Sequence, residues 1–427
     1  MTPSVPHART EAYASTARND DLPATAAPAL SAGYRAVRGH TEALAATLSG
    51  EDQCIQSMPD ASPVKWHRAH TTWFFETFVA QPFIPGYRPF DPRFNFLFNS
   101  YYEAVGARHP RIARGLITRP TATEVGAYRH AVDAAILAWL DAASGAVPAE
   151  AAVLVTLGLN HEEQHQELLL TDILHAFAQS PLLPAAIPAW REPTPAPGPT
   201  RFVTMPGGIA SIGHRGPEAP DAGFCFDSET PRHRVLLQPC QIASRLVRNA
   251  EYQAFMNDGG YRQVGLWMTD GWDEVKANGW HAPLHWRQDT PGAAWHQMTP
   301  AGLADLDPDA AVRHISWYEA DAYARWAGAR LPTEAELEAA HALTGSDALQ
   351  ELTGHVWQWT NSAYLPYPGF RAAPGAVGEY NGKFMINQMV LRGGSLATPD
   401  GHTRASYRNF FPPMKRWQFS GVRLARD

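Results

Sequence analysis

The segment between Pro148 and Pro181 is long enough for one uninterrupted helix, and no proline or paired glycine falls between these two residues. Proline is tolerated in a first helical turn and ends a helix when it follows one. The run NHEEQHQELLL begins at Asn160 and sets His161 and His165 four residues apart. Side chains with this spacing lie one turn apart on the same helical face. The segment therefore predicts a helix that presents two imidazoles together.

The two histidines continue an apolar stripe of this helix. Steps of three and four residues align them with Val153, Leu157 and Leu168. This alignment favours a buried face, where imidazole nitrogens need partners, and a metal ion is one such partner. Two solvated histidines on a charged helix are the alternative for an arbitrary HxxxH pattern. We expect His161 and His165 to be metal ligands.

A second segment, SPVKWHRAHTTWFFE, offers a third histidine. We expect Ser62 to cap a helix here and Pro63 to be its first residue. His70 is the candidate ligand. His67 points nearly a third of a turn away from its neighbour Trp66 and is expected only to hydrogen-bond near the site. A core histidine bonded to a carbonyl is the alternative for His70. The residues expected to share its face are Trp66, Trp73, Phe74 and Thr77.

Length and charge narrow the class of protein. With 427 residues the chain exceeds one typical domain, and a formal net charge of -7 argues against a nucleic-acid partner. No apolar run is long enough to cross a bilayer, so we expect small-molecule substrates and no membrane partner. The three cysteines form no CxxC pair, which predicts neither a disulfide framework nor a thiolate zinc site and suits a cytoplasmic location.

Composition divides the chain into four regions, which together predict an α+β multidomain protein. Residues 1–30 are rich in Ala, Thr, Ser and Pro and predict a disordered tail. Periodic apolar stretches over 31–180 predict a bundle of four helices. Seven prolines within 181–200 predict an extended connector, and short strand-like runs between glycine turns over 201–427 predict an irregular mixed domain. The helices are expected around 34–49, 62–80, 122–143 and 148–179.

Three motifs of the second half carry a resemblance. RLPTEAE contains Thr333 and Glu336 at capping-box spacing, GHVWQWT begins at Gly354, and RGGS begins at Arg392. In this order they resemble the formylglycine-generating-enzyme fold, also called the sulfatase-modifying-factor fold, an irregular relative of C-type lectins. That fold's own chemistry uses cysteines late in the domain. This chain has none after Cys240, so we do not expect formylglycine formation.

The whole arrangement, a DinB-like bundle bearing WHxxH and HxxQH joined to a sulfatase-modifying-factor domain, resembles the ergothioneine sulfoxide synthases, also called hercynine oxygenases. The resemblance includes FNSYYEAVG from Phe98 and YRNFFPP from Tyr407. Members hold ferrous iron with three histidines and use O2 to join a thiol sulfur to C2 of the hercynine imidazole as a sulfoxide. The resemblance implies Fe(II), with O2 as co-substrate, and the ligands His70, His161 and His165. Three imidazoles also suit zinc, so ligand type alone leaves the metal open.

The resemblance also implies roles for polar side chains. Tyr101 and Tyr102 are candidates for the proton or hydrogen donor that favours C–S bond formation over thiol dioxygenation, and aromatic packing is the alternative. Gln164 matches a position that hydrogen-bonds the betaine substrate, although a surface position is also open. Asn409 matches a position near the substrate carboxylate or imidazole. We therefore expect the active site between the two domains.

Aromatic residues near the C-terminus bear on both substrates. Phe410, Phe411 and Trp417 are candidates for the trimethylammonium pocket, with packing of the last strand as the alternative. The branch that uses γ-glutamylcysteine carries an acidic residue where this chain has Phe411, which cannot make that contact. Cysteine is therefore the expected thiol, with γ-glutamylcysteine or a selenosugar as alternative substrates.

Two functions from other classes stay open. A zinc-dependent thiol transferase on the same bundle would contain zinc and act without O2. A lectin-like module that binds carbohydrate or peptide, with the bundle as a stalk, would keep its binding after loss of His161.

Overall fold

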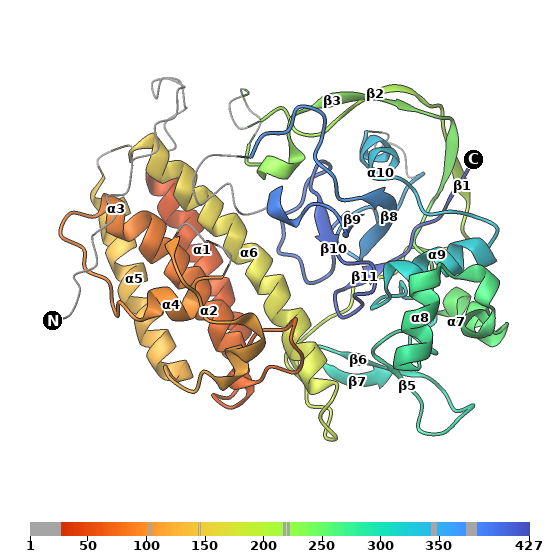
Figure 1. Cartoon of the computed structure of the whole chain (residues 1–427), viewed down its shortest axis with the longest axis horizontal. Coiled ribbons are helices and arrows are strands. Elements are labelled where there is room, and N and C mark those ends of the chain that lie inside the picture. Colours follow the sequence, from red (N-terminus) through yellow and green to blue (C-terminus); the bar gives the residue numbers. More distant parts are fainter. Residues whose placement is uncertain are drawn as a thin grey trace.

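The protein, seen in a computed structural model, is an α+β molecule in which a helical bundle lies beside an irregular mixed part (Figure 1). This confirms the expected fold class. Most of the predicted tail lies outside the described residues, but helix α1 begins at Ala27, inside that segment. The structure describes residues 27–100, 102, 105–143, 145, 147–216, 219, 223–342, 348–372 and 382–427.

The bundle contains four long helices. Three of them agree with the predicted segments to within a few residues, and the first begins at Ala27, seven residues before its predicted start at 34. The second long helix, α2 (Val64–Phe75), continues in a π-helical turn, Glu76–Ala80. This turn leads into α3 (Gln81–Phe83) and then α4 (Phe94–Phe98). Buried aromatic and aliphatic side chains fill the space between the helices. The long helices are α1 (Ala27–Ala45), α2 (Val64–Phe75), α5 (Ala122–Ala142) and α6 (Ala149–Phe177).

Two local predictions for the bundle are wrong. Pro63 takes the cap position of α2 and Val64 is its first helical residue. The Ser62 backbone N–H instead donates to the Asp172 carboxylate of α6 at 2.7 Å, so a tertiary contact replaces the expected cap. On α6 the expected apolar stripe is not buried along its whole length, because Val153, in the first turns of the helix, is 52% exposed.

A buried ion network fixes α6 against its neighbours. Glu162 pairs with Arg129 and, at 2.7 Å, with Arg38. It also accepts a hydrogen bond from the Thr41 hydroxyl at 2.6 Å. Burial disfavours the Glu162 charge, but Arg129 and Arg38 outweigh burial and lower its pKa to about 2. Because unpairing a buried charge is costly, this network holds the rotation of α6 and the direction of its histidines.

In the mixed part, residues 201–427, the described residues form four small sheets and four α-helices. Neighbouring strands are antiparallel except for the parallel pair β8 and β11. The sheets are β1 (Phe202–Met205), β4 (Cys240–Ala243) and β12 (Ala425–Arg426); β2 (Gly208–Ile212) and β3 (His233–Leu237); β5 (Trp286–Arg287), β6 (His296–Thr299) and β7 (Gly302–Asp305); and β10 (Asn409–Phe411), β9 (Met389–Arg392), β8 (Trp357–Ala363) and β11 (Ser420–Gly421). The helices are α7 (Asn249–Asn257), α8 (Thr269–Asn278), α9 (Trp317–Trp326) and α10 (Glu334–His341).

The predicted capping box is present at the start of α10. The Thr333 hydroxyl accepts from the Glu336 backbone N–H, and the Glu336 carboxylate accepts from the Thr333 N–H. The connector 181–200 forms no helix or strand. Among the residues that the structure describes, no helix combines the length and apolar character needed to span a bilayer.

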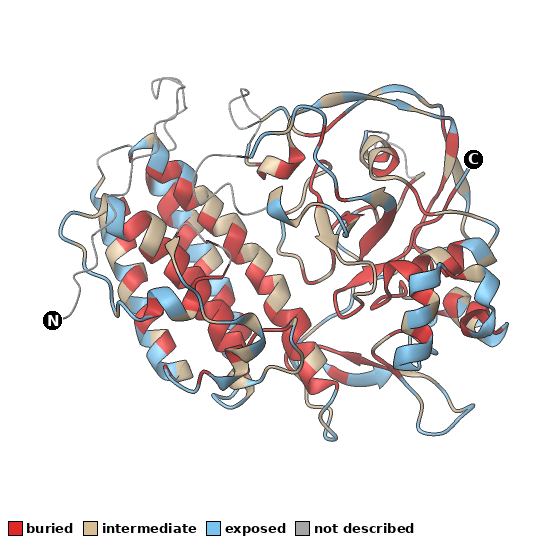
Figure 2. Ribbon diagram, viewed as in Figure 1, coloured by how far each residue is buried: buried red, intermediate tan, exposed pale blue. Residues whose placement is uncertain are grey.

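The C-terminal half of α6 belongs to both halves of the molecule. Its side chains Leu169, Ile173 and Phe177 share one buried cluster with Met298 and Phe419 of the mixed part. Figure 2 shows buried residues continuing along α6 to where it meets the mixed part. This shared packing places the C-terminal half of α6 at the junction.

The junction is also hydrogen-bonded through Glu167 of α6. Its carboxylate accepts from Trp357 Nε1 at 2.8 Å and from the Ser395 and Thr398 hydroxyls, each at 2.6 Å. Hydrogen bonds to a carboxylate are stronger than neutral ones. Glu167 therefore ties the segment that carries the histidines to the loop after β9.

Candidate metal centre and substrate pocket

Three histidines from two helices converge inside the bundle. His70 comes from α2, and His161 and His165 come from α6; all three are buried. Their candidate ligand nitrogens lie within 4.8 Å of one another. The ring centroids of His161 and His165 are 4.6 Å apart, and that of His70 lies 5.0 and 4.7 Å from them. The structure thus brings the three predicted ligands together.

The protonation of these rings suits metal binding. Burial lowers the pKa of His70 and His165 well below the usual value and that of His161 to about 3, so the imidazoles are neutral. His70 Nδ1 lies 2.6 Å from the Phe98 carbonyl and donates to it. Its Nε2 is buried and makes no hydrogen bond among the described residues. A buried lone pair of this kind is costly unless it is satisfied, and a divalent metal would satisfy it.

His165 is held by another histidine. His165 Nδ1 lies 2.8 Å from His67 Nδ1, and His67 Nε2 lies 3.1 Å from the Asp172 carboxylate. Asp172 also accepts from Trp417 Nε1 of the mixed part at 3.0 Å. Both ring nitrogens of His67 are thus engaged, which agrees with the expectation that His67 hydrogen-bonds beside the site and is not a ligand.

The tyrosine pair is only partly described. The Tyr102 ring is 2% exposed and packs 5.5 Å from Trp73 and 5.3 Å from Phe78, between ring centroids. Tyr102 is not among the described residues that line the pocket beside the histidines. Tyr101 lies outside the described residues, so the donor role of the pair stays a prediction.

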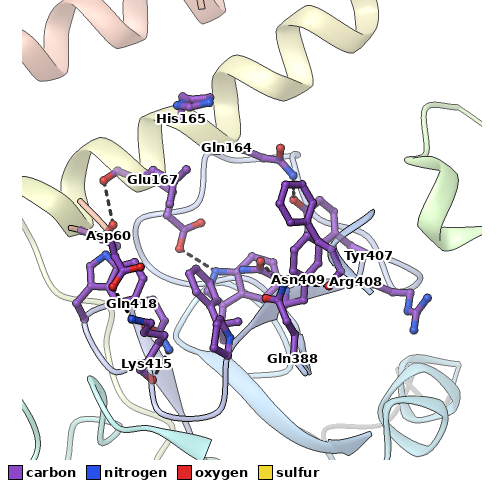
Figure 3. A pocket seen from close by; sticks show the side chains of 18 of the residues that line it. Asp60, Gln164, His165, Glu167, Gln388, Tyr407, Arg408, Asn409, Lys415 and Gln418 are labelled. Carbon is purple, nitrogen blue, oxygen red and sulfur yellow. Dashed lines mark hydrogen bonds and ion pairs between the residues drawn. The ribbon is translucent and has the colours of Figure 1, made fainter. Parts of the chain in front are cut away.

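A cavity of about 270 Å³ opens between α6 and the mixed part, with His165 in its wall. All the predicted substrate-contact residues line this cavity. They enter it from opposite sides, Gln164 from α6 and Asn409 from β10 (Figure 3). Their contacts with substrate stay predictions. These residues are Gln164, Asn409, Phe410, Phe411 and Trp417.

A chain of hydrogen bonds holds Gln164 from the mixed part. The Gln164 Nε2 donates to the Tyr407 hydroxyl at 2.5 Å, which lies 3.3 Å from His402 Nε2. His402 Nδ1 is 2.8 Å from the Glu163 carboxylate. Burial raises the pKa of Tyr407, so its hydroxyl stays protonated. The segment between the two α6 histidines is therefore oriented by residues more than two hundred positions away.

Aromatic rings form another wall of the cavity. Phe410 stacks on Tyr364 with 4.1 Å between centroids, and Phe411 meets Trp417 edge to face at 5.4 Å. The Asn409 side-chain oxygen accepts from the Phe410 backbone N–H at 2.9 Å. Such rings can receive a trimethylammonium group, which has no N–H to donate.

Charged side chains from both halves line the cavity as well. Lys415 of the mixed part forms an ion pair with Asp60, and Arg111 donates to the Asp60 carbonyl oxygen. All three residues line the cavity. Opposite charges placed side by side suit the ammonium and carboxylate of an amino acid.

Several residues of this cavity were missed by reasoning from the sequence. Glu167 forms hydrogen bonds with residues up to 231 positions away, and no local sequence pattern predicts such a contact. Tyr407 had a usable signal, because it stands two residues before Asn409 in the run YRNFFPP. The missed residues are Asp60, Arg111, Glu167, Trp357, His402, Tyr407 and Lys415.

Two family models match this chain. Residues 34–169 match the DinB superfamily, and residues 190–349 and 345–427 match the sulfatase-modifying factor enzyme 1-like domain. The fold and the site therefore define a DinB-type bundle, with a candidate histidine metal centre, joined to a sulfatase-modifying-factor-type domain.

Curated relatives identify the family. A hercynine oxygenase of Mycolicibacterium smegmatis is 31% identical over 420 residues, covering 87% of this chain and 92% of the relative. One of Mycobacterium tuberculosis is 32% identical, covering 88% and 93%. A formylglycine-generating enzyme of Streptomyces coelicolor is 37% identical, but over only 34% of this chain and 49% of its own length. This chain belongs to the hercynine oxygenase family and is an enzyme of the oxidoreductase class.

Proposed function

We propose that this enzyme uses ferrous iron and O2 to join the sulfur of cysteine to C2 of the hercynine imidazole, giving hercynylcysteine sulfoxide for ergothioneine biosynthesis. Hydrogen leaves C2 and the thiol as the C–S bond forms. One oxygen atom of O2 enters the sulfoxide and the other leaves as water. The convergence of His70, His161 and His165 beside a cavity between the two halves carries this proposal.

The three histidines would hold the metal from one side. His70, His161 and His165 would supply three neutral imidazoles and leave the metal open to substrates from the cavity. Iron supplies the redox chemistry with O2, which zinc lacks. His70 is oriented by a backbone carbonyl and His165 by His67, so both rings are fixed before any metal arrives.

Hercynine is proposed to lie between α6 and β10. Gln164 and Asn409 line the cavity from opposite sides and offer amide groups to its imidazole and carboxylate. The Phe410, Phe411 and Trp417 rings line the same cavity and would receive the trimethylammonium group. Confinement there keeps the imidazole carbon near the thiol sulfur, which favours coupling.

Cysteine is proposed to bind where charges of both signs meet. Asp60 would accept from its ammonium group, and Arg111 and Lys415 would donate to its carboxylate. Phe411 supplies no charge for the larger head of γ-glutamylcysteine. The same reaction with γ-glutamylcysteine or a selenosugar is the alternative.

The donor that steers the reaction toward C–S coupling is proposed to be a tyrosine of the pair 101 and 102. Tyr102 is packed among the Trp73 and Phe78 rings, which supports a structural role for it. Tyr101 is therefore the first candidate for the donor.

The test is anaerobic reconstitution with Fe(II), followed by addition of hercynine, cysteine and O2 and mass spectrometry of the product. The coupled sulfoxide should form with the wild-type enzyme, and His161→Ala should lose both bound iron and product. His175→Ala is the matched control, because His175 lies on the same helix and bonds Ser57 instead. Full iron occupancy in His161→Ala would remove His161 from the ligand set.

The same assay decides between classes. Thiol-transfer activity with zinc and without O2, and no coupled sulfoxide, would favour the thiol transferase over the oxygenase. Glycan or peptide binding that survives His161→Ala, with no product from the wild type, would favour a binding module.

A further inference from the structure

We infer that His67 and Asp172 are positioning residues for the ligand His165, and that Trp417 of the mixed part anchors them. This inference rests on the proposed metal site. The four side chains form one chain of contacts, which runs from Trp417 Nε1 to Asp172 at 3.0 Å, on to His67 at 3.1 Å and then to His165 at 2.8 Å. All four residues are buried, with exposed fractions from 3% to 7%.

The direction of each hydrogen bond follows from the donors available. An ionised Asp172 only accepts, and it receives the Trp417 indole N–H, the Ser62 backbone N–H and the His67 Nε2–H. A neutral His67 has no second N–H, so its Nδ1 is an acceptor. His165 Nδ1 faces it at 2.8 Å and must donate. The lone pair of His165 is therefore on Nε2.

The reverse arrangement would work against a metal. If both nitrogens of His67 were donors, His165 Nδ1 would have to accept and its proton would sit on Nε2. That proton would occupy the nitrogen that a metal needs. The Asp172 carboxylate, fixed by two further donors, thus selects the tautomer in which His165 can bind.

This support differs from that of His70, which bonds a carbonyl of the bundle's own backbone. His165 instead depends on side chains from both halves of the molecule. Trp417 also lines the cavity and packs on Phe411. Docking of the mixed part should therefore set how well the bundle holds its metal.

The experiment measures metal affinity in the full chain. We would titrate the metal-free protein with Co(II), following the visible absorption of the bound ion, and with Fe(II) under anaerobic conditions by calorimetry. His67→Leu removes the acceptor at similar size and should weaken binding about 10- to 100-fold, as loss of an outer partner of a metal ligand does. His67→Asn keeps an oxygen near the place of Nδ1 and should recover most of that affinity with a wild-type Co(II) spectrum.

Two further variants test the rest of the chain. Asp172→Asn should weaken binding, because an amide cannot accept from all three donors. Trp417→Phe should weaken it in the same direction by a smaller factor. His175→Leu, on the same helix but outside the chain of contacts, should leave affinity and spectrum unchanged.

The outcomes separate the two proposals. Wild-type affinity in a folded His67→Leu protein would overturn the positioning role. Equal losses in His67→Leu and His67→Asn, with unchanged Co(II) spectra, would indicate packing alone and also overturn it. If His67→Leu fails to fold, the same titration of Asp172→Asn and Trp417→Phe tests the positioning role, and wild-type affinity in both would overturn it. Failure of the wild type to bind Fe(II) or Co(II) would instead refute the proposed metal centre.

Discussion

The amide nitrogen of Gln164 lies 2.5 Å from the hydroxyl of Tyr407, so a residue between two α6 histidines is held by the mixed part. Tyr407→Phe removes this hydrogen bond and weakens the hold of the mixed part on the Gln164 amide. Because one such bond contributes about 1 kcal/mol, KM for hercynine should rise roughly five- to tenfold. Steady-state kinetics with saturating cysteine measure this change.

Tyr323→Phe is the control for that variant. Tyr323 is a buried tyrosine of α9 that stacks on Tyr252 in the core of the mixed part and does not line the cavity. Loss of the Tyr323 hydroxyl should leave KM for hercynine unchanged. An unchanged KM in Tyr407→Phe would show that Gln164 needs no such support.

The choice of thiol should respond to Phe411. Phe411→Asp introduces a carboxylate beside Trp417 in the cavity wall, where it can accept from the ammonium group of γ-glutamylcysteine. The ratio of kcat/KM for γ-glutamylcysteine to that for cysteine should rise about tenfold, the effect of one well-placed charged hydrogen bond. Phe411→Leu should not shift the ratio. Equal shifts in both variants would indicate altered cavity volume as the cause.

Replacing Tyr101 and replacing Tyr102 should have different effects. Tyr101→Phe should divert flux from the coupled sulfoxide toward cysteine sulfinate, because the donor is lost while the metal is kept. Tyr102→Phe should keep the product ratio and lower stability only slightly, since its ring still packs on Phe78. Liquid chromatography with mass spectrometry gives both products in one run. A wild-type ratio in both variants would refute the tyrosine donor.

Acid should destabilise the mixed part through His285 and His314. Burial lowers the pKa of both rings well below the usual value, so the folded protein keeps them neutral. The unfolded chain protonates them as pH falls below about 6.5. The unfolded state then binds more protons, and the free energy of unfolding falls by up to about 1.4 kcal/mol per pH unit for each histidine.

Urea unfolding of the metal-free protein between pH 7.5 and 5 measures this dependence. His285→Gln combined with His314→Asn should make it less steep, while the buried histidines of the bundle keep the remainder. Asn tolerates the positive φ of 62° at position 314. His281→Gln, at an exposed position, should keep the wild-type slope. An unaltered slope in the double variant would assign the acid sensitivity to other groups.

Local sequence patterns predicted most of the bundle helices and the helical face that His161 and His165 share. The spacing of His161 and His165 needs only helical geometry, and the long helices follow from apolar periodicity between prolines. His70 could be proposed as a ligand from the pattern of its own helix. Its closeness to the histidines of α6 depends on how the two helices pack, which local patterns do not give. The expected cap at Ser62 failed because the Asp172 carboxylate, 110 residues away, holds that amide.

The residues of the cavity were harder to predict from local sequence patterns. Gln164 and Asn409 were found only through resemblance to a family, since nothing local links them. Glu167 and Tyr407 gain their importance from partners on the other half of the molecule, 190 to 243 residues away in sequence. Contacts of this kind depend on how the mixed part docks, which periodicity and capping signals do not encode.

The most direct test of the account is a crystal of the anaerobically iron-loaded enzyme, measured with anomalous scattering at the iron edge. The account predicts one strong iron peak within coordination distance of a ring nitrogen of each of His70, His161 and His165, facing the cavity that holds Gln164 and Asn409. No peak there, or an iron held by other residues, would contradict it.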